Sequence, residues 1–180
     1  MSRRNIDPLA LDETIDKRKE NDVESVSLCE HQPLAQIPIK VLRGHTGAVT
    51  SCHFCFSDTR VLTGSQDKTA RLWDTESGAT LLAFEGGHAL TISECVLVPD
   101  KNRLITASWD KRIHAWDLET GKILWTAVQD GLVTSCDISG DGRYVVSSSY
   151  PENIMYLNSA DTGERIFQIR DALTPACFHC

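Results

Sequence analysis

Short apolar segments alternate with turn residues along most of the chain. From Ile37 to Ile169 these segments alternate apolar and polar side chains, the pattern of β-strands with one buried face. Clusters of Asp, Asn, Ser and Gly separate the segments, as in tight turns between antiparallel strands. The pattern predicts strands at residues 37–42, 48–55, 61–65, 70–73, 81–84, 92–97, 104–108, 113–116, 123–125, 133–138, 144–149, 154–157 and 165–169. We therefore expect an all-β fold.

Two groups of four predicted strands carry the same landmarks. Gly44-His45 and Trp73-Asp74 bracket the first group, and Gly87-His88 and Trp116-Asp117 bracket the second, 43 residues later at each position. A Gly-His start, a Trp-Asp end and this period are typical of a WD40 repeat. The chain therefore resembles the WD40-repeat family. The resemblance implies β-propeller blades that form a binding scaffold for other proteins, without catalysis.

A third group of strands follows, but it lacks the family landmarks. Gln129 or Asp130 stands at the His position, and the turn of residues 150–153 replaces the Asp. Asn158 or Leu157 stands at the Trp position. The strand alternation and the turn at residues 161–163 persist, so we expect a third blade.

The expected domains are a tail of residues 1–36 and a partial propeller of residues 37–180, with blades at about 44–84, 87–128 and 130–169. Charged residues crowd the segment 12–24 without strand alternation, so we expect the tail to be disordered. Residues 174–180 resemble the start of a further strand. Because a propeller ring needs four or more blades, we expect an incomplete, open array. A truncated isoform or fragment without independent function is the alternative to a working module.

The resemblance also implies a buried tetrad of polar side chains in each of the first two repeats. The tetrads are His45, Ser65 (or Thr63), Asp67 and Trp73, and His88, Ser108 (or Thr106), Asp110 and Trp116. In such a set the Asp orients the imidazole, a hydroxyl joins the chain of hydrogen bonds, and the indole donates. Ser, His and Asp also form catalytic triads, but a triad occurs once per site and has an exposed nucleophile. Repetition in consecutive units favours the structural role.

Two C-x-x-C sequences, at residues 52–55 and 177–180, raise the question of a metal site. However, Cys52, Cys95, Cys136 and Cys177 recur at spacings of 43, 41 and 41 residues, so they mark one repeat position. Residues three apart on a strand also point to opposite faces. We therefore predict buried apolar cysteines, no metal and no cofactor.

Binding in this family usually uses the narrow rim of the propeller. The residue before each tetrad Asp, and those flanking the apolar anchor of each first strand, are expected to protrude there. These candidates are Gln66, Trp109, Tyr150, Ala48, Thr50, Thr91, Ser93, Leu132 and Thr134. Trp109 is the strongest candidate for a hot spot, because an exposed Trp offers a large contact area at small entropic cost. Packing of Trp109 on the adjacent blade is the alternative.

Composition limits the partners further. A net charge of −7 argues against nucleic acid, and no apolar run approaches the ~20 residues that span a bilayer. The N-terminus has no apolar core of a secretory signal, so we expect an intracellular protein, cytoplasmic or nuclear, with reduced cysteines. The expected partners are other proteins, not small-molecule substrates.

The segment 116–125, and less closely 161–164, also resembles the repeat of quinoprotein propellers. That resemblance implies a blade-like turn followed by an outer strand. A quinoprotein-like propeller enzyme is therefore an alternative function, although no cofactor-binding residues can be picked out.

Overall fold

The computed structural model describes residues 39–99 and 101–170, and within them every regular element is a β-strand. The twelve strands are β1 (Val49–Cys55), β2 (Arg60–Ser65), β3 (Ala70–Asp74), β4 (Thr80–Phe84), β5 (Ile92–Leu97), β6 (Arg103–Ser108), β7 (Arg112–Asp117), β8 (Ile123–Val128), β9 (Leu132–Ile138), β10 (Tyr144–Tyr150), β11 (Ile154–Ser159) and β12 (Arg165–Arg170). All belong to one compact unit that begins at Lys40. The expected all-β fold is confirmed.

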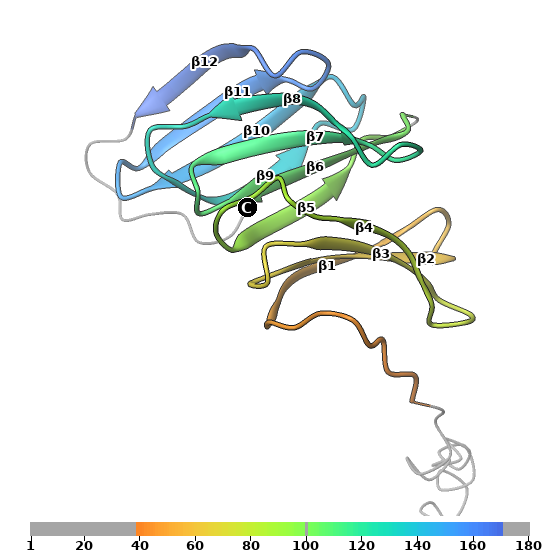
Figure 1. The fold of residues 1–180 in the computed structure, drawn as a ribbon. Coiled ribbons are helices and arrows are strands. Elements are labelled where there is room, and N and C mark those ends of the chain that lie inside the picture. Colours follow the sequence, from red (N-terminus) through yellow and green to blue (C-terminus); the bar gives the residue numbers. More distant parts are fainter. Residues whose placement is uncertain (1–38, 100, 171–180) are drawn as a thin grey trace, which may run out of the picture. The chain divides into compact units, whose positions relative to one another are not determined.

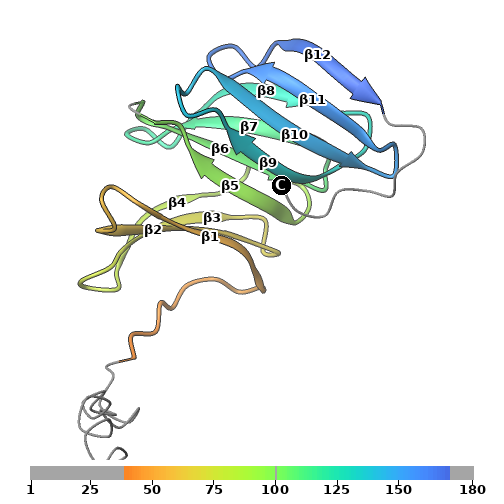
Figure 2. The same ribbon diagram turned by 180° about the vertical axis from the view of Figure 1, so that it is seen from behind.

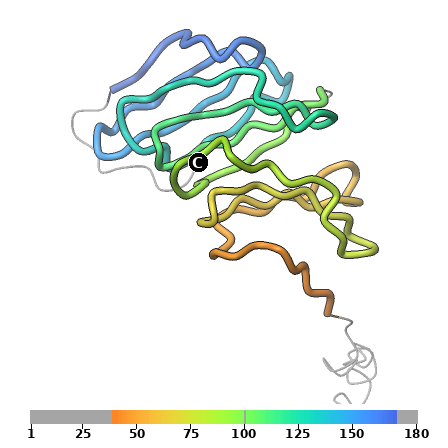
Figure 3. Tube along the Cα trace, viewed as in Figure 1, coloured from red at the N-terminus to blue at the C-terminus, as the bar shows by residue number. Residues whose placement is uncertain are grey.

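The strands form three separate antiparallel sheets of four strands, each built from strands that follow one another in sequence: β1–β4, β5–β8 and β9–β12. Figures 1 and 2 show the sheets placed next to one another in chain order. The trace in Figure 3 passes back and forth through one sheet before it enters the next. Contacts between sheets run mainly through β1, β5 and β9. Each sheet is one propeller blade, and the described blades form an open array.

All three blades share two irregularities. The register shifts near the start of the first strand, between Val49 and Ser51 in β1, between Ile92 and Glu94 in β5, and at the matching place in β9–β10. A second shift lies between the third and fourth strands of each blade, beside Trp73, Trp116 and Asn158. Bulges at equivalent places bend the strands alike. The third group therefore folds as a blade despite its missing landmarks.

Two apolar cores hold neighbouring blades together. Leu62, Leu72 and Phe84 of the first blade pack against residues of the second, including Cys95 and Trp116. Ile105 and Ala115 of the second blade pack in the same way against Val133, Cys136 and Val145 of the third. Each fully buried side chain of this size contributes about 1.5–3 kcal/mol. The blades therefore stabilise one another face to face.

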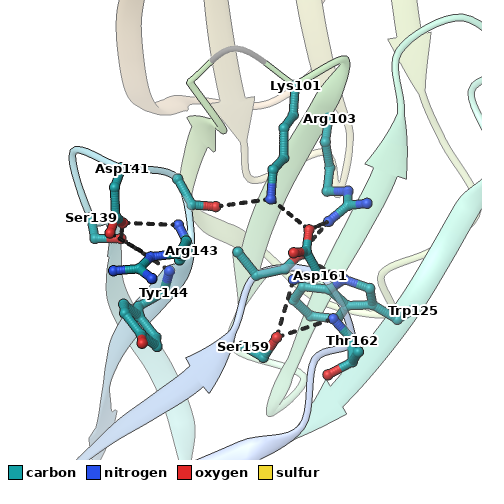
Figure 4. Close-up of polar contacts among 12 residues, drawn as sticks. Lys101, Arg103, Trp125, Ser139, Asp141, Arg143, Tyr144, Ser159, Asp161 and Thr162 are labelled. Atoms are coloured by element: carbon teal, nitrogen blue, oxygen red, sulfur yellow. Dashed lines mark hydrogen bonds and ion pairs between the residues drawn. The ribbon is translucent and has the colours of Figure 1, made fainter.

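Polar contacts also join the second blade to the third. Asp161 accepts from Lys101 Nζ at 2.6 Å and from Arg103 Nη1 at 2.9 Å, and Figure 4 shows the three side chains converging. Arg103 and the Trp125 indole both donate to the carbonyl of Ala160, at 2.6 and 3.1 Å. Lys101, Arg103 and Trp125 of the second blade thus bind the turn after β11. The sequence pattern did not indicate this contact.

The strand predicted at residues 37–42 does not form among its described residues, 39–42. Val41 is exposed, and the segment joins none of the three sheets. Lys40 instead donates to the backbone carbonyls of Thr75 and Glu76 in the β3–β4 turn. Alternation alone predicted a strand here, but a strand also needs a neighbour to pair with, and the described residues offer none.

The prediction of buried cysteines is correct for two of the repeat positions and wrong for one. Cys95 and Cys136 are buried between blades, whereas Cys52 is exposed because no blade within the described part of the chain covers its face of β1. Cys52, Cys55 and Cys95 are free thiols. Cys177, the predicted further strand at 174–180 and the predicted tail of residues 1–36 lie outside the described residues.

Gly163 combines a left-handed backbone with close packing, and its replacement should be costly. Its φ is +76°, and an added Cβ would lie 2.5 Å from the Trp125 ring. Gly121, in the equivalent turn of the second blade, has a φ of +67° and open space around it. Gly121→Ala should lower the free energy of unfolding by about 1–2 kcal/mol, and Gly163→Ala by about 1–3 kcal/mol more. Urea denaturation measures both, and equal losses would contradict the packing argument.

Candidate functional site: polar tetrads and a groove where three blades meet

The first blade contains a continuous chain of hydrogen bonds that runs from Asp67 to Trp73. Asp67 accepts from His45 Nδ1 at 2.8 Å, which leaves His45 Nε2 to accept from the Thr63 hydroxyl at 2.7 Å. The Trp73 indole donates to the same Thr63 oxygen at 2.8 Å. The second blade repeats this with His88, Asp110, Thr106 and Trp116 at 2.8–2.9 Å. Each set ties the turn before the blade's first strand to its second and third strands.

The hydroxyls are those of Thr63 and Thr106, so Ser65 and Ser108 are not tetrad members. Both serines are buried on the same strand face as the two threonines, but they lie two residues nearer the turn. Ser65 Oγ accepts from the Asp67 amide, and Ser108 Oγ from the Asp110 amide, both at 3.1 Å. Each serine therefore shapes the turn, and neither is bonded to an imidazole. Thr63 and Thr106 are buried, at 6% and 0% exposure, beneath the indoles.

The third blade replaces the tetrad with amide side chains. Gln129, not Asp130, takes the His position and donates to Ser147 Oγ at 3.3 Å and to Asn158 Oδ1 at 3.5 Å. Asn158, not Leu157, takes the Trp position and donates to the Gly163 carbonyl at 2.9 Å. Asp130 accepts from the Tyr156 hydroxyl at 2.8 Å. The third blade thus keeps a buried hydrogen-bond network, although it lacks the His, Asp and Trp of the tetrads in the first two blades.

One group among residues 39–99 and 101–170 has the spacing of metal ligands: His88, Asp110 and His114, whose ligand atoms lie within 4.8 Å of one another. Each imidazole nitrogen already has a protein partner. His88 bonds Asp110 and Thr106, and His114 bonds the Thr126 hydroxyl at 2.8 Å and the Gly87 carbonyl at 3.1 Å. A metal would have to displace these bonds. The arrangement therefore serves packing and hydrogen bonding.

A groove of about 390 Å³ lies where the three blades meet, between β1, β5 and β9. It is lined by Thr50, Ser93, Trp109, Leu132, Thr134 and Tyr150. Trp109 and Tyr150, from neighbouring blades, are 43% and 45% exposed. Six of the nine residues expected at a binding rim thus surround one hollow.

The hydroxyls along this groove are engaged inside the protein. Thr50 donates to the Ile92 carbonyl at 2.5 Å, and Ser93 donates to the Val133 carbonyl at 2.7 Å, each across a blade boundary. Thr134 bonds Ser148 Oγ at 2.9 Å. The surface left to a ligand is therefore mostly aromatic and aliphatic.

The other three rim candidates lie outside this hollow. Gln66 and Ala48 are exposed, and Thr91 is half-buried, but none of them lines the groove. Gln66 takes the place in the first blade that Trp109 takes in the second. Gln66 is not part of the groove lining, so its position in the first blade adds no aromatic wall to the groove.

Two family models match the chain. The model of the WD domain, G-beta repeat, matches residues 36–74, and the model described as outer membrane protein assembly factor BamB matches residues 57–179. WD repeat-containing protein 88 of Homo sapiens is 40% identical over 181 residues, covering 96% of this chain and 38% of that protein. The chain belongs to the WD40-repeat β-propeller family, and over residues 57–179 to the propeller-repeat family of the BamB model. The resemblance of its linkers to quinoprotein-type repeats is thereby confirmed as well.

Other relatives agree with this membership. Guanine nucleotide-binding protein subunit beta-5b of Danio rerio is 42% identical over 64 residues, covering 36% of this chain and 16% of that protein. The crystal structure of the WD40 beta propeller domain of Doa1 matches with a TM-score of 0.67 at 24% identity, covering 76% of this chain and 45% of that one. The chain thus spans less than two-fifths of the length of the human relative. WD40 proteins generally bind other proteins and are generally not enzymes.

The WD40 tetrads shift the ionisation of their acids. Burial raises the pKa of Asp110, but hydrogen bonds from His88 and from the Ala89 and Arg112 amides outweigh it and hold the pKa at about 2. The pKa of Asp67 is lowered further, because hydrogen bonds from Thr69, Thr46 and His45 outweigh the effect of its burial. Both carboxylates stay charged well below neutral pH.

His114 belongs to this cluster, although the sequence pattern did not single it out. It lies two residues before Trp116 on β7, so strand alternation places both on one face, and its ring lies 4.3 Å from that of His88. Burial and the nearby His88 lower the pKa of His114 to about 4. The alternation rule that located Trp109 would also have found this histidine.

The described residues contain no helical segment with the length and apolar character needed to cross a bilayer.

Proposed function

We propose that this chain is a non-catalytic scaffold that binds a segment of another protein in the groove beside Trp109. The observation that carries the proposal is the convergence of Trp109 and Tyr150, from two blades, on one apolar hollow. Exposed aromatic residues around a concave surface are typical of interaction hot spots. The family's general role in protein binding supports the same conclusion.

The ligand should present an apolar side chain. Because Thr50 and Ser93 already donate to backbone carbonyls, the groove offers methyl groups, the Leu132 side chain and two aromatic rings. A hollow of about 390 Å³ accommodates a branched aliphatic or an aromatic side chain with part of its backbone. We infer that the partner inserts one such anchor residue from an extended segment.

Selection from a displayed library of random peptides tests this proposal. Peptides that bind the chain should share an apolar anchor, and Trp109→Ala should weaken their binding at least about ten-fold, which corresponds to roughly 1.4 kcal/mol. Gln66→Ala is the matched control, because Gln66 occupies the equivalent position in the first blade but does not line the groove. Fluorescence anisotropy measures both affinities.

The thermal unfolding of Trp109→Ala should remain close to that of the wild type, since the side chain is partly exposed. Equal affinities for the two variants would argue against the groove. A destabilised Trp109→Ala with unchanged affinity would instead favour the alternative, packing of Trp109 on the adjacent blade.

A second candidate, a quinoprotein-like enzyme, draws on the match over residues 57–179. We propose that this match reflects blade construction, because the matching segments form turns and outer strands such as β8 and β12. Addition of the quinone cofactor with an electron-accepting dye tests the alternative. Alcohol- or aldehyde-dependent reduction of the dye would support the enzyme.

A further inference from the structure

We propose that the groove beside Trp109 selects partner segments that carry a lysine or arginine next to the apolar anchor, and that Glu152 holds this basic side chain. The inference rests on the proposed function and deepens it, because it names the charge of the partner. Three observations carry it: the place of Glu152 at one end of the groove, the glycine that gives its carboxylate room, and the lack of an ionic partner within the described chain.

Glu152 lies directly beyond one wall of the groove. Tyr150 and Leu132 face each other where β10 pairs with β9, and both line the groove. Glu152 follows Tyr150 by two residues, in the turn before β11. On the neighbouring strand, Gly131 directly precedes Leu132. The turn residue and the glycine therefore both stand at the same end of the groove.

Space, and not backbone conformation, requires a glycine at residue 131. Gly131 has no left-handed φ, but an added Cβ would lie 2.9 Å from the Glu152 carboxyl carbon and 2.6 Å from the Tyr150 carbonyl oxygen. The Glu152 carboxylate thus rests against the backbone of Gly131. Because a side chain at residue 131 would displace it, the glycine keeps this charge beside the groove wall.

Glu152 differs from the acids in the corresponding turns of the first two blades. Asp67 and Asp110 each accept from a tetrad imidazole and from a backbone amide. The third blade has Gln129 in place of that histidine. Glu152 is exposed, and within residues 39–99 and 101–170 it makes neither a hydrogen bond nor an ion pair. Its charge is therefore available to a bound segment.

The basic side chains at this rim hold other partners. Lys111 donates to the Asp130 carbonyl at 3.0 Å, and Arg170 pairs with the Asp130 carboxylate at 3.6 Å. Arg165 donates to the carbonyl of the last residue of β8, at 3.0 Å. The chain also carries a net charge of −7, which attracts basic segments over a longer range. A cation that approaches the groove therefore meets an acid that no neighbouring base has paired.

An extended partner segment reaches both the groove and the carboxylate. Residues of such a segment advance by about 3.4 Å each, so a residue one or two positions from the anchor lies over the end of the groove. Lysine and arginine lay their methylene stems along apolar surface while the charged head reaches an acid. Since Glu152 stands at one end only, the basic residue should occur on one side of the anchor only.

Selection from a displayed library of random peptides tests this preference. Peptides that bind the wild-type chain should carry Lys or Arg on one side of the shared apolar anchor. Peptides that bind Glu152→Lys should keep the anchor and carry Asp or Glu at that position. Glu119→Lys is the matched control, because Glu119 is exposed but follows β7, whereas Trp109 precedes it. This variant should select the same peptides as the wild type.

A double-mutant cycle measures the contact itself. Replacement of the basic residue in a selected peptide by alanine should weaken binding to the wild-type chain about two- to five-fold, as for other partly exposed ion pairs. With Glu152→Gln the same change in the peptide should have little effect, because the opposite charge is gone. Added salt should reduce the wild-type difference. Fluorescence anisotropy measures the affinities, and circular dichroism verifies that the variants keep their strands.

The outcomes separate the role of Glu152 from the function on which it rests. An apolar anchor without a basic neighbour, or a basic neighbour that persists with Glu152→Lys, would overturn the role of Glu152 and leave the groove as the binding site. Peptides that share no apolar anchor, or whose affinity is unchanged by Trp109→Ala, would overturn both.

Discussion

Trp116→Ala should lower the free energy of unfolding by about 3–5 kcal/mol, as truncations of large buried aromatic residues do. Trp116 is 3% exposed, its ring contacts Phe84 and His114, and its indole donates to Thr106. Removal leaves a cavity at the junction of the first two blades and takes one hydrogen bond from the Thr106 hydroxyl, which keeps its bond to His88. Since domains are stable by only about 5–15 kcal/mol, much of the chain's stability would be lost. Urea denaturation monitored by circular dichroism measures the change.

Two further variants separate the contributions to that loss. Trp116→Phe keeps a ring in the junction but loses the bond to Thr106, so it should cost less than Trp116→Ala. Trp109→Ala removes the same side chain from an exposed position and should change stability by only about 0.5 kcal/mol. If truncation of Trp116 cost no more than truncation of Trp109, the tetrad would not support the blade junction.

The stability of the chain should decline as the pH falls from about 6.5 to about 4. The pKa of His114 is about 4 in the folded chain, against an ordinary value of 6.5. Unfolded chains therefore bind a proton in this window that the folded chain excludes. The stability that neutral His114 provides is complete above pH 6.5 and is lost progressively below it, by up to about 1.4 kcal/mol per pH unit. Asp110, with a pKa of about 2 against 3.8, extends the decline to lower pH.

His114→Gln isolates the histidine's share, because glutamine does not titrate and its amide can still donate to the Gly87 carbonyl. The free energy of unfolding of the variant should vary less with pH between 6.5 and 4 than that of the wild type. Urea midpoints in a series of buffers measure both slopes. Parallel slopes would show that His114 takes up its proton equally well in the folded chain.

Alternation and turn residues predicted most of the fold because both act locally. Each of β1–β12 lies where a period of two met a turn signal, including the strands of the third blade. The exception, residues 37–42, shows the limit of this reasoning. A pattern can favour an extended backbone, but only a neighbouring strand completes its hydrogen bonds, and that neighbour is a property of the tertiary structure.

The site was predictable where position along a strand decided it. Trp109, Tyr150, Thr50 and Ser93 line one groove, as their places relative to the tetrads suggested. The choice between Ser65 and Thr63 depended on which oxygen lies within reach of both an imidazole and an indole, which spacing does not reveal. The prediction that Cys52 is buried was wrong for a related reason. Burial of Cys52 depends on a blade that packs against its face of β1.

The order of strands within each sheet has a further consequence for how the chain acquires its structure. Among residues 39–99 and 101–170, every pairing joins strands adjacent in sequence, and none of these strands is inserted into another sheet. Contacts of short sequence separation form fast, since little chain entropy is lost in closing each hairpin. During synthesis, one sheet can be completed on the ribosome before the next has emerged. Nascent chains should therefore mature stepwise, each new sheet docking on the one already formed.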